Sequence, residues 1–222
     1  MNEPLPLIVA NFKANKNWDA VARWLDLIGF QSSSFSGTII VCPSAPFLAA
    51  AHQMQMANSA WRLQIGIQDL SQFEQGAYTG EVAASQISNL VKYAVIGHSE
   101  RRQHFGEGDP VLATKVDNAT KSRIEPIFCV QDENTAIPTG VKIVAYEPVF
   151  AIGTGNPDSP ENAQDVSQKI IGKGDYIVLY GGSVTDLNIK SFLKEGVIDG
   201  ALIATSSLDP QSFIKILEAV KS

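Results

Sequence analysis

The stretch from residue 142 to residue 180 reads KIVAYEPVFAIGTGNPDSPENAQDVSQKIIGKGDYIVLY. It opens with the apolar run Ile143–Tyr146 and closes with a second one, residues 176–180. Between them, Ser159-Pro160 is typical of a helix start, because a serine N-cap precedes a proline at the first helical position. Gly172 stands where that helix would end. The stretch therefore predicts a buried strand, a helix and another buried strand.

The same alternation extends over the whole chain. Asp109-Pro110 and Asp209-Pro210 repeat the signal of an N-cap before a proline, and Gly196 stands at another expected helix end. Eight such alternations in 222 residues favour a closed (β/α)8 barrel, a single domain over residues 1–222, ahead of an open doubly wound sheet. The apolar runs expected as strands are residues 7–10, 38–42, 63–67, 94–96, 127–130, 143–146, 176–180 and 201–204.

The connections between these strands differ in length. From His98 to Cys129 there are 31 positions (129 − 98), but from Cys129 to Glu147 there are only 18 (147 − 129). Residues 131–141 are near the minimum that joins two parallel strands and cannot also hold a normal helix. We expect the fifth crossover helix to be missing or much shortened.

Composition limits the partners. The formal charge of −6 and the pI near 5.1 argue against nucleic acid or an anionic membrane, and favour a small-molecule ligand. Cys42 and Cys129 each lie in an apolar run with no metal-ligand spacing, as expected of buried thiols in a reducing compartment. The N-terminal residues show no signal-peptide pattern and no apolar stretch is long enough to span a membrane, so we expect a cytoplasmic protein.

Polar residues of the types that act in catalysis follow several of the expected strands. Asn11 and Lys13 follow the first, His98 the fourth and Glu147 the sixth, while Gly181-Gly182-Ser183 follows the seventh. Barrel enzymes build their sites at this end of the strands. Glu147 is followed by a proline, a short apolar segment and two glycines, a pattern that describes a carboxylate beneath a hinged lid.

Each of these residues also has an ordinary interpretation. A lysine is usually solvated, a lone histidine is more often structural, and a glutamate before a turn is often an exposed loop residue. Gly181-Gly182 is compatible with a simple turn, and Glu100-Arg101-Arg102 with a surface charge cluster, although the cluster also suits ion pairs that hold Lys13. Their coincidence at one end of the barrel favours a catalytic site.

Five segments of the chain match the pattern of a known family. They are Ala10-Asn11-Phe12-Lys13-Ala14-Asn15, Gln75-Gly76-Ala77-Tyr78-Thr79-Gly80-Glu81, Val95-Ile96-Gly97-His98-Ser99-Glu100-Arg101-Arg102, Ala145-Tyr146-Glu147-Pro148-Val149-Phe150-Ala151-Ile152-Gly153-Thr154-Gly155 and Tyr180-Gly181-Gly182-Ser183-Val184. With these segments the chain resembles the triosephosphate isomerase family over nearly its whole length. The resemblance implies a TIM barrel and a cofactor-independent isomerase, without a metal, that interconverts dihydroxyacetone phosphate and glyceraldehyde 3-phosphate through an enediolate.

The resemblance also implies roles for individual residues. Glu147 would move the proton, neutral His98 would donate to the substrate oxygens, and Lys13 with Asn11 would offset the enediolate charge. The supporting residues would be Ser99, Glu100, Tyr180 and Thr79. Phosphate would be bound by backbone N–H groups of Gly153, Ser183, Ala204 and Thr205. The Gly76-Ala77-Tyr78-Thr79-Gly80 segment implies a homodimer, and a higher oligomer is left open.

The chain departs from the family pattern at several positions. Ala204 and Thr205 replace a glycine pair, and their Cβ atoms are expected to restrict positive φ and narrow the approach to phosphate. Phe150 and Asn156 replace the usual Trp and Lys at the ends of the lid. Gln131-Asp132 replaces Gly-Glu at the shortened fifth crossover, where we expect a less covered barrel wall. A second shortening is expected in the sixth crossover, before Tyr176.

Two other functions compete with this interpretation. The first is another phosphate-binding barrel enzyme, such as a sugar-phosphate epimerase or a synthase of aromatic amino-acid biosynthesis, which would carry other residues at the first, fourth and sixth strand ends. The second is a barrel that binds a triose phosphate without turnover, as a sensor or scaffold. Lys13, His98 and Glu147 together argue against both.

Overall fold

The structure, a computed structural model, describes residues 6–149, 158–194 and 196–221. Its strands are parallel and close into a barrel in which each strand pairs with its neighbours in the chain and β8 returns to β1. The closed barrel is confirmed, and the open sheet is wrong. The strands are β1 Leu7–Asn11, β2 Thr38–Cys42, β3 Gln64–Ile67, β4 Tyr93–Ile96, β5 Glu125–Val130, β6 Ile143–Tyr146, β7 Ile177–Tyr180 and β8 Gly200–Ile203.

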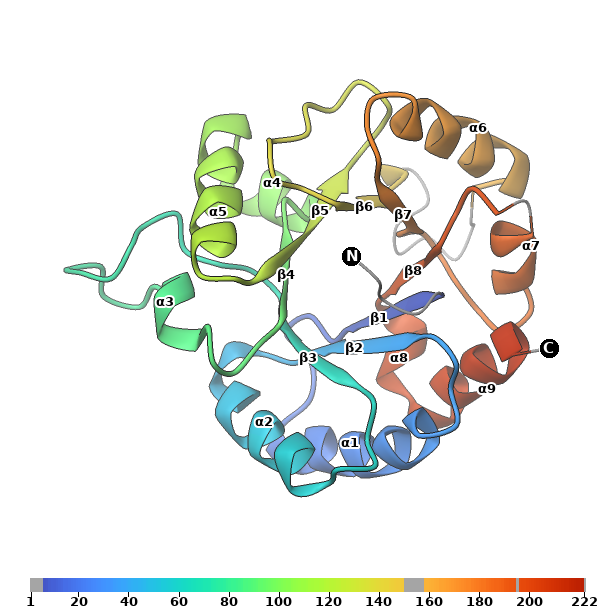
Figure 1. Ribbon diagram of the computed structural model, residues 1–222, viewed down its shortest axis with the longest axis horizontal. Helices are drawn as coiled ribbons and strands as arrows, with labels where there is room; N and C mark the ends of the chain where they lie inside the picture. Colours follow the sequence, from blue (N-terminus) through green and yellow to red (C-terminus); the bar gives the residue numbers. More distant parts are fainter. Residues whose placement is uncertain (1–5, 150–157, 195, 222) are drawn as a thin grey trace.

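Helices form an outer ring around the strands (Figure 1). Trp24 on the first helix packs against Phe12 and Phe213, and so joins that helix to the barrel and to the last helix. The helices are α1 Trp18–Ser32, the 3-10 turn η1 Ala45–Phe47, α2 Leu48–Ala57, α3 Ala84–Ile87, α4 Ser99–Phe105, α5 Asp109–Lys121, α6 Pro160–Ile171, α7 Ile189–Leu193, α8 Thr205–Leu208 and α9 Pro210–Lys221.

Two of the three predicted N-caps are confirmed. The Ser159 hydroxyl accepts the N–H of Asn162, and the Asp209 carboxylate accepts the N–H of Ser212. The prediction for Asp109 is wrong: Gly108 is the N-cap of α5, and the Asp109 carboxylate pairs with Arg102 at 3.1 Å. An ion pair to the neighbouring α4 has displaced the local cap.

The sheet is apolar on both faces, as parallel strands require when helices cover their outer face. Side chains alternate along each strand, so one set fills the barrel and the other packs under the helices. The set inside the barrel is Leu7, Val9, Ile40, Cys42, Tyr93, Val95, Ile127, Cys129, Ile143, Ala145, Leu179 and Leu202. Both cysteines are buried and unpaired, as predicted.

The fifth crossover contains no helix between β5 and β6, as the chain length predicted. The ring of helices is closed there by irregular chain between α5 and α6 (Figure 1). The Asp132 carboxylate accepts the N–H groups of Asn134 and Thr135, at 2.8 and 2.9 Å, and so forms a tight turn. Glu133 pairs with Lys169 on α6 at 3.4 Å.

The expectation of a less covered barrel wall at this point is wrong. The outward side chains of β5 and β6 are buried: Phe128, Val130, Val144 and Tyr146. Ile137 of the crossover packs against this core, and the Arg102 guanidinium lies over the Phe128 ring at 5.7 Å. Irregular chain and a long cationic side chain thus cover the wall in place of a helix. The sixth crossover keeps α6, a helix of 12 residues.

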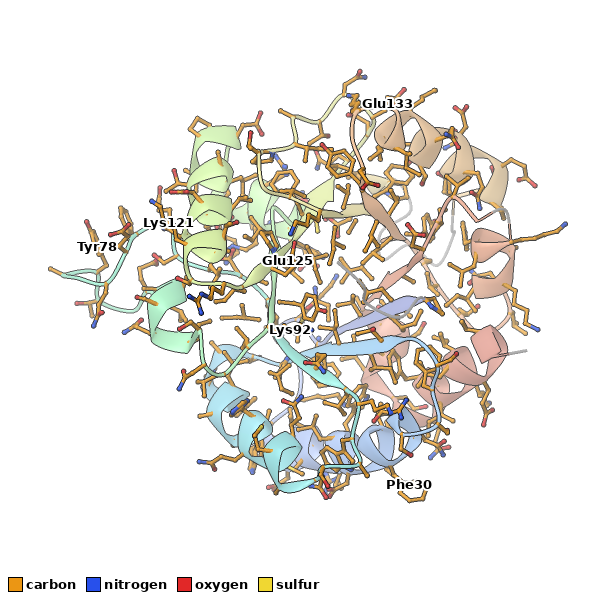
Figure 2. All side chains as sticks on the ribbon, viewed as in Figure 1. Phe30, Tyr78, Lys92, Lys121, Glu125 and Glu133 are labelled. Carbon is orange, nitrogen blue, oxygen red and sulfur yellow. The ribbon has the colours of Figure 1, made fainter. Side chains whose placement is uncertain are left out.

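The loop between β3 and α3 projects from the barrel (Figure 1). Phe73 and Tyr78 stack within it, with ring centroids 4.0 Å apart, which stiffens the loop. Tyr78 lies far out on this projection (Figure 2).

Candidate active site

Glu147 is a buried carboxylate at the C-terminal end of β6. Its N–H donates to the carbonyl of Val130 at 2.8 Å, which continues the strand pairing, and its side chain is only 2 % exposed. The carboxylate accepts the N–H of Ser99 at 2.8 Å and lies 3.1 Å from Nε2 of His98. Burial raises the pKa of Glu147, and these two partners limit the rise.

His98 is the N-cap of helix α4, and its Nε2 faces Glu147. Gly97 precedes it with φ of +77°, a conformation that side chains other than glycine rarely adopt, so the chain can turn sharply there. Nδ1 of His98 accepts the N–H of Glu100 at 3.2 Å. A ring nitrogen that accepts an N–H carries no proton, so the proton of a neutral imidazole lies on Nε2, the atom that faces Glu147.

Lys13 follows β1. Hydrogen bonds fix its backbone, and a carboxylate pairs with its side chain. Its φ is +51°, and its N–H donates to the side-chain oxygen of Asn11 at 3.0 Å. Gln68 donates to its carbonyl oxygen at 2.9 Å. Its ammonium lies 2.7 Å from Glu100. Burial acts to raise the pKa of Glu100, but the hydrogen bond and charge of Lys13 outweigh burial and lower it.

Lys13, His98 and Asn11 line a common cavity of about 400 Å³. Its other walls include Glu100 from α4 and Glu81 from the projecting loop. Glu147 does not line this cavity, because it lies behind His98 and is nearly sealed from solvent. The cation and the imidazole are thus open to a small ligand, with the carboxylate in contact with the imidazole.

Two loops at the ends of β7 and β8 lie side by side. The Ser206 hydroxyl donates to the carbonyl of Val184 at 2.6 Å and so joins the Ser183 loop to α8. Ala204 has φ of −101°, and Thr205 is not among the described residues with positive φ. The backbone is therefore not left-handed at these positions, as expected of residues that carry a Cβ atom, and the narrower approach to phosphate stays a prediction. Gly181 is needed next to the site: a Cβ there would lie 2.9 Å from Cγ of Glu147.

Comparisons with known proteins give the family. The family model described as Triosephosphate isomerase matches residues 6–142 and 139–220, and the two matches meet in the fifth crossover. The chain is 37 % identical to the triosephosphate isomerase of Mesomycoplasma hyorhinis, over 95 % of this chain and 97 % of that protein. It is 34 % identical to the enzyme of Aquifex aeolicus, over 95 % and 98 %.

The chain belongs to the triosephosphate isomerase family. The predicted family, barrel and isomerase class are thereby confirmed, with a triose phosphate as substrate. The solved triosephosphate isomerase of Bartonella henselae has the same fold, with a TM-score of 0.85 at 24 % identity over 98 % of this chain and 99 % of that one. No helix in the described ranges is long and apolar enough to cross a membrane.

Some residues implied by the triosephosphate isomerase pattern are outside the described part of the chain, and others lie away from the cavity. Gly153, Phe150 and Asn156, with the predicted lid, lie outside the described residues. Thr79 is exposed on the projecting loop and does not line the cavity of its own chain. Tyr180 is fully buried behind the site, and its hydroxyl accepts the N–H of Asp158 at 2.9 Å.

Beneath α4 lies an ion cluster that the sequence indicated only in part: Arg101 was expected to suit ion pairs, but its partners were not identified. Nζ of Lys115 lies 2.7 Å from both Asp69 and Glu107, and Arg101 pairs with the same two carboxylates at 2.8 and 2.6 Å. The cluster joins α4, which begins directly after His98, to α5 and the projecting loop. Besides Arg101, the signal in the sequence was a lysine on the buried face of a helix, which becomes visible once the helix phase is known.

Proposed function

We propose that Glu147 is the base that removes a proton from the hydroxymethyl carbon of dihydroxyacetone phosphate. The proton then returns to the neighbouring carbon, while the carbonyl oxygen and the hydroxyl exchange roles through an enediolate. Burial supports this role, because a carboxylate removed from water binds a proton more readily than an exposed one. The transfer requires protein side chains alone.

His98 and Lys13 stabilise the enediolate. Nε2–H of neutral His98 donates to the substrate oxygens, and the Lys13 ammonium offsets the negative charge that develops on them, with Asn11 beside it. Because Nε2 lies 3.1 Å from Glu147, this contact has to open before both groups can reach the same substrate molecule. Ser99, which donates its N–H to Glu147, holds the carboxylate in place.

The phosphate is bound at the ends of β7 and β8, by backbone N–H groups of Ser183, Ala204 and Thr205, and the family pattern implies a further N–H from Gly153, which lies outside the described residues. The hydrogen bond between Ser206 and Val184 supports this placement, since it keeps the loop after β7 next to the loop after β8. Tyr180 and Glu100 support the site indirectly. The Tyr180 hydroxyl accepts the backbone N–H of Asp158, and the Glu100 carboxylate accepts a hydrogen bond from the Lys13 ammonium.

The observation that best supports this proposal is the contact of Glu147 with His98. The variant Glu147→Gln tests the proposal. In a coupled assay with dihydroxyacetone phosphate, kcat should fall on the order of thousandfold, because an amide cannot take the proton. Glu218→Gln, the same exchange at an exposed position on α9, should retain the parent kcat. Equal rates for the parent and Glu147→Gln would contradict the proposal.

The functional unit is a homodimer of one-domain chains, located in the cytoplasm. The projecting Gly76-Ala77-Tyr78-Thr79-Gly80 loop supports a dimer, because its stacked tip extends away from the barrel that carries it (Figure 2). In a dimer, Thr79 of this loop would reach the partner's Lys13 and His98 through the cavity beside them. The buried free thiols suit a reducing compartment.

A further inference from the structure

We propose that Asp158 is a positioning residue for the isomerase reaction: it holds together the ends of β6 and β7 and thereby orients Glu147. The inference rests on the proposed role of Glu147 as the base. Asp158 is a carboxylate that is only 7 % exposed, and it contacts two tyrosines that each directly precede a residue of the site.

Both oxygens of the Asp158 carboxylate accept hydrogen bonds. Oδ2 accepts the hydroxyl of Tyr146 at 3.3 Å and the amide of Asn162 at 2.8 Å, while Oδ1 accepts the N–H of Ser159 at 2.8 Å. A buried carboxylate is stable in a fold only when such donors replace water. Of these donors, Tyr146 alone comes from the barrel.

The backbone of Asp158 makes a second link to the barrel. Its N–H donates to the hydroxyl of Tyr180 at 2.9 Å. Tyr146 and Tyr180 are partners in the register of β6 and β7, with ring centroids 6.4 Å apart. Tyr180 is further fixed by stacking on Phe192, with centroids 3.9 Å apart. Asp158 therefore joins β6 to β7, in addition to the backbone hydrogen bonds between these two strands.

These tyrosines stand directly before the reacting part of the site. Glu147 follows Tyr146, and Gly181 follows Tyr180 and donates its N–H to the Tyr146 carbonyl at 2.7 Å. The Cγ of Glu147 lies against Gly181, with no space for a Cβ between them. A shift of Tyr146 relative to Tyr180 would thus change the direction of the Glu147 carboxylate. Small displacements of a reacting group lower the rate of a chemical step strongly.

A purely local role would be to stabilise the start of α6, through Asn162 and Ser159. That role predicts a loss of thermal stability with an unchanged kcat. The positioning role predicts a lower kcat with little change in KM, because substrate binding uses other groups than the base. Substitutions at Asp158 and Tyr146 should then be non-additive, since they break one contact.

The test is a double-mutant cycle of Asp158→Asn and Tyr146→Phe, with kcat, KM and Tm measured for each protein. Each single variant should lower kcat by about tenfold with KM within about twofold, and the double variant should be no slower than the slower single one. Asp165→Asn is the matched control: the same exchange on α6, at a carboxylate that is 63 % exposed, should leave kcat at the parent value.

An unchanged kcat in both single variants, or fully additive losses, would overturn the inference. If Asp158→Asn does not fold, Tyr146→Phe removes a single hydroxyl and decides the matter by its own kcat. The proposed function is judged separately in the same assay by the parent and Glu147→Gln. An active parent that depends on Glu147 but not on Asp158 would reject the positioning role alone.

Discussion

At the residue scale, the burial of Glu147 has consequences for both activity and stability. Burial raises its pKa above the ordinary value of 4.5, because the charged form loses water. The folded protein therefore prefers the protonated acid. Stability from this residue is fully present below pH 4.5 and is lost as the pH rises through the raised pKa of the folded state.

This shift predicts the acid side of the pH profile. Only the ionised Glu147 can take a proton, so kcat/KM in the free enzyme should fall as the pH decreases through the raised pKa, at a value above 4.5. The measurement is kcat/KM against pH, at pH values where circular dichroism shows the protein folded. An acid limb at or below 4.5 would mean that another group controls the rate.

The places of Glu147, His98 and Lys13 at the strand ends were predictable one by one from the sequence. Glu147, His98 and Lys13 each follow an apolar run closely, and the barrel brings strand ends together. Asp158 was not predictable in the same way. Its partners Tyr146 and Tyr180 lie 12 and 22 positions away in the chain, and only the strand register places them side by side.

At the element scale, the fifth crossover shows how a barrel tolerates the loss of a helix. Asp132 organises the replacement turn by accepting two backbone N–H groups and the Thr135 hydroxyl, and Glu133 ties the turn to α6 (Figure 2). The sequence predicted that the helix would be missing or much shortened, because chain length alone decides it. It did not predict the covered wall, which depends on how Ile137 and Arg102 pack.

Loss of the turn at Asp132 is expected to lower the stability of the protein and to leave kcat unchanged. Asp132→Ala should lower Tm by about 2–4 °C, the shift expected for a loss of about 1 kcal/mol, because several local hydrogen bonds are removed. The change in Tm is read by differential scanning calorimetry, beside kcat in the coupled assay. Asp175→Ala, at another exposed aspartate outside helices and strands, should leave Tm nearly unchanged. A Tm for Asp132→Ala equal to that of the parent would show that the turn does not depend on this carboxylate.

At the scale of the whole molecule, the strands were the most predictable feature. Continuous apolar runs are typical of parallel strands that are buried on both faces, and the predicted runs matched the observed strands to within one or two residues. The Asp109 cap was wrong, because an ion pair with α4 decides where that carboxylate lies.

The projecting loop predicts the assembly. Sedimentation equilibrium should give twice the chain mass of 23.9 kDa, and Tyr78→Asp should shift the protein toward the monomer, because a charge replaces an aromatic ring in the interface. Phe30→Asp is the matched control: its ring is 76 % exposed on α1, away from the loop, and its loss should not change the mass (Figure 2). A parent that sediments as a monomer would contradict the proposed dimer.

The most direct test of the account follows the proton itself. Dihydroxyacetone phosphate is incubated in D₂O with the parent or with Glu147→Gln, and deuterium at the hydroxymethyl carbon is followed by NMR. The parent should incorporate solvent deuterium there, because the base exchanges its proton while the enediolate exists, and Glu147→Gln should incorporate it on the order of thousandfold more slowly. Exchange at the parent rate in Glu147→Gln would show that another group takes the proton.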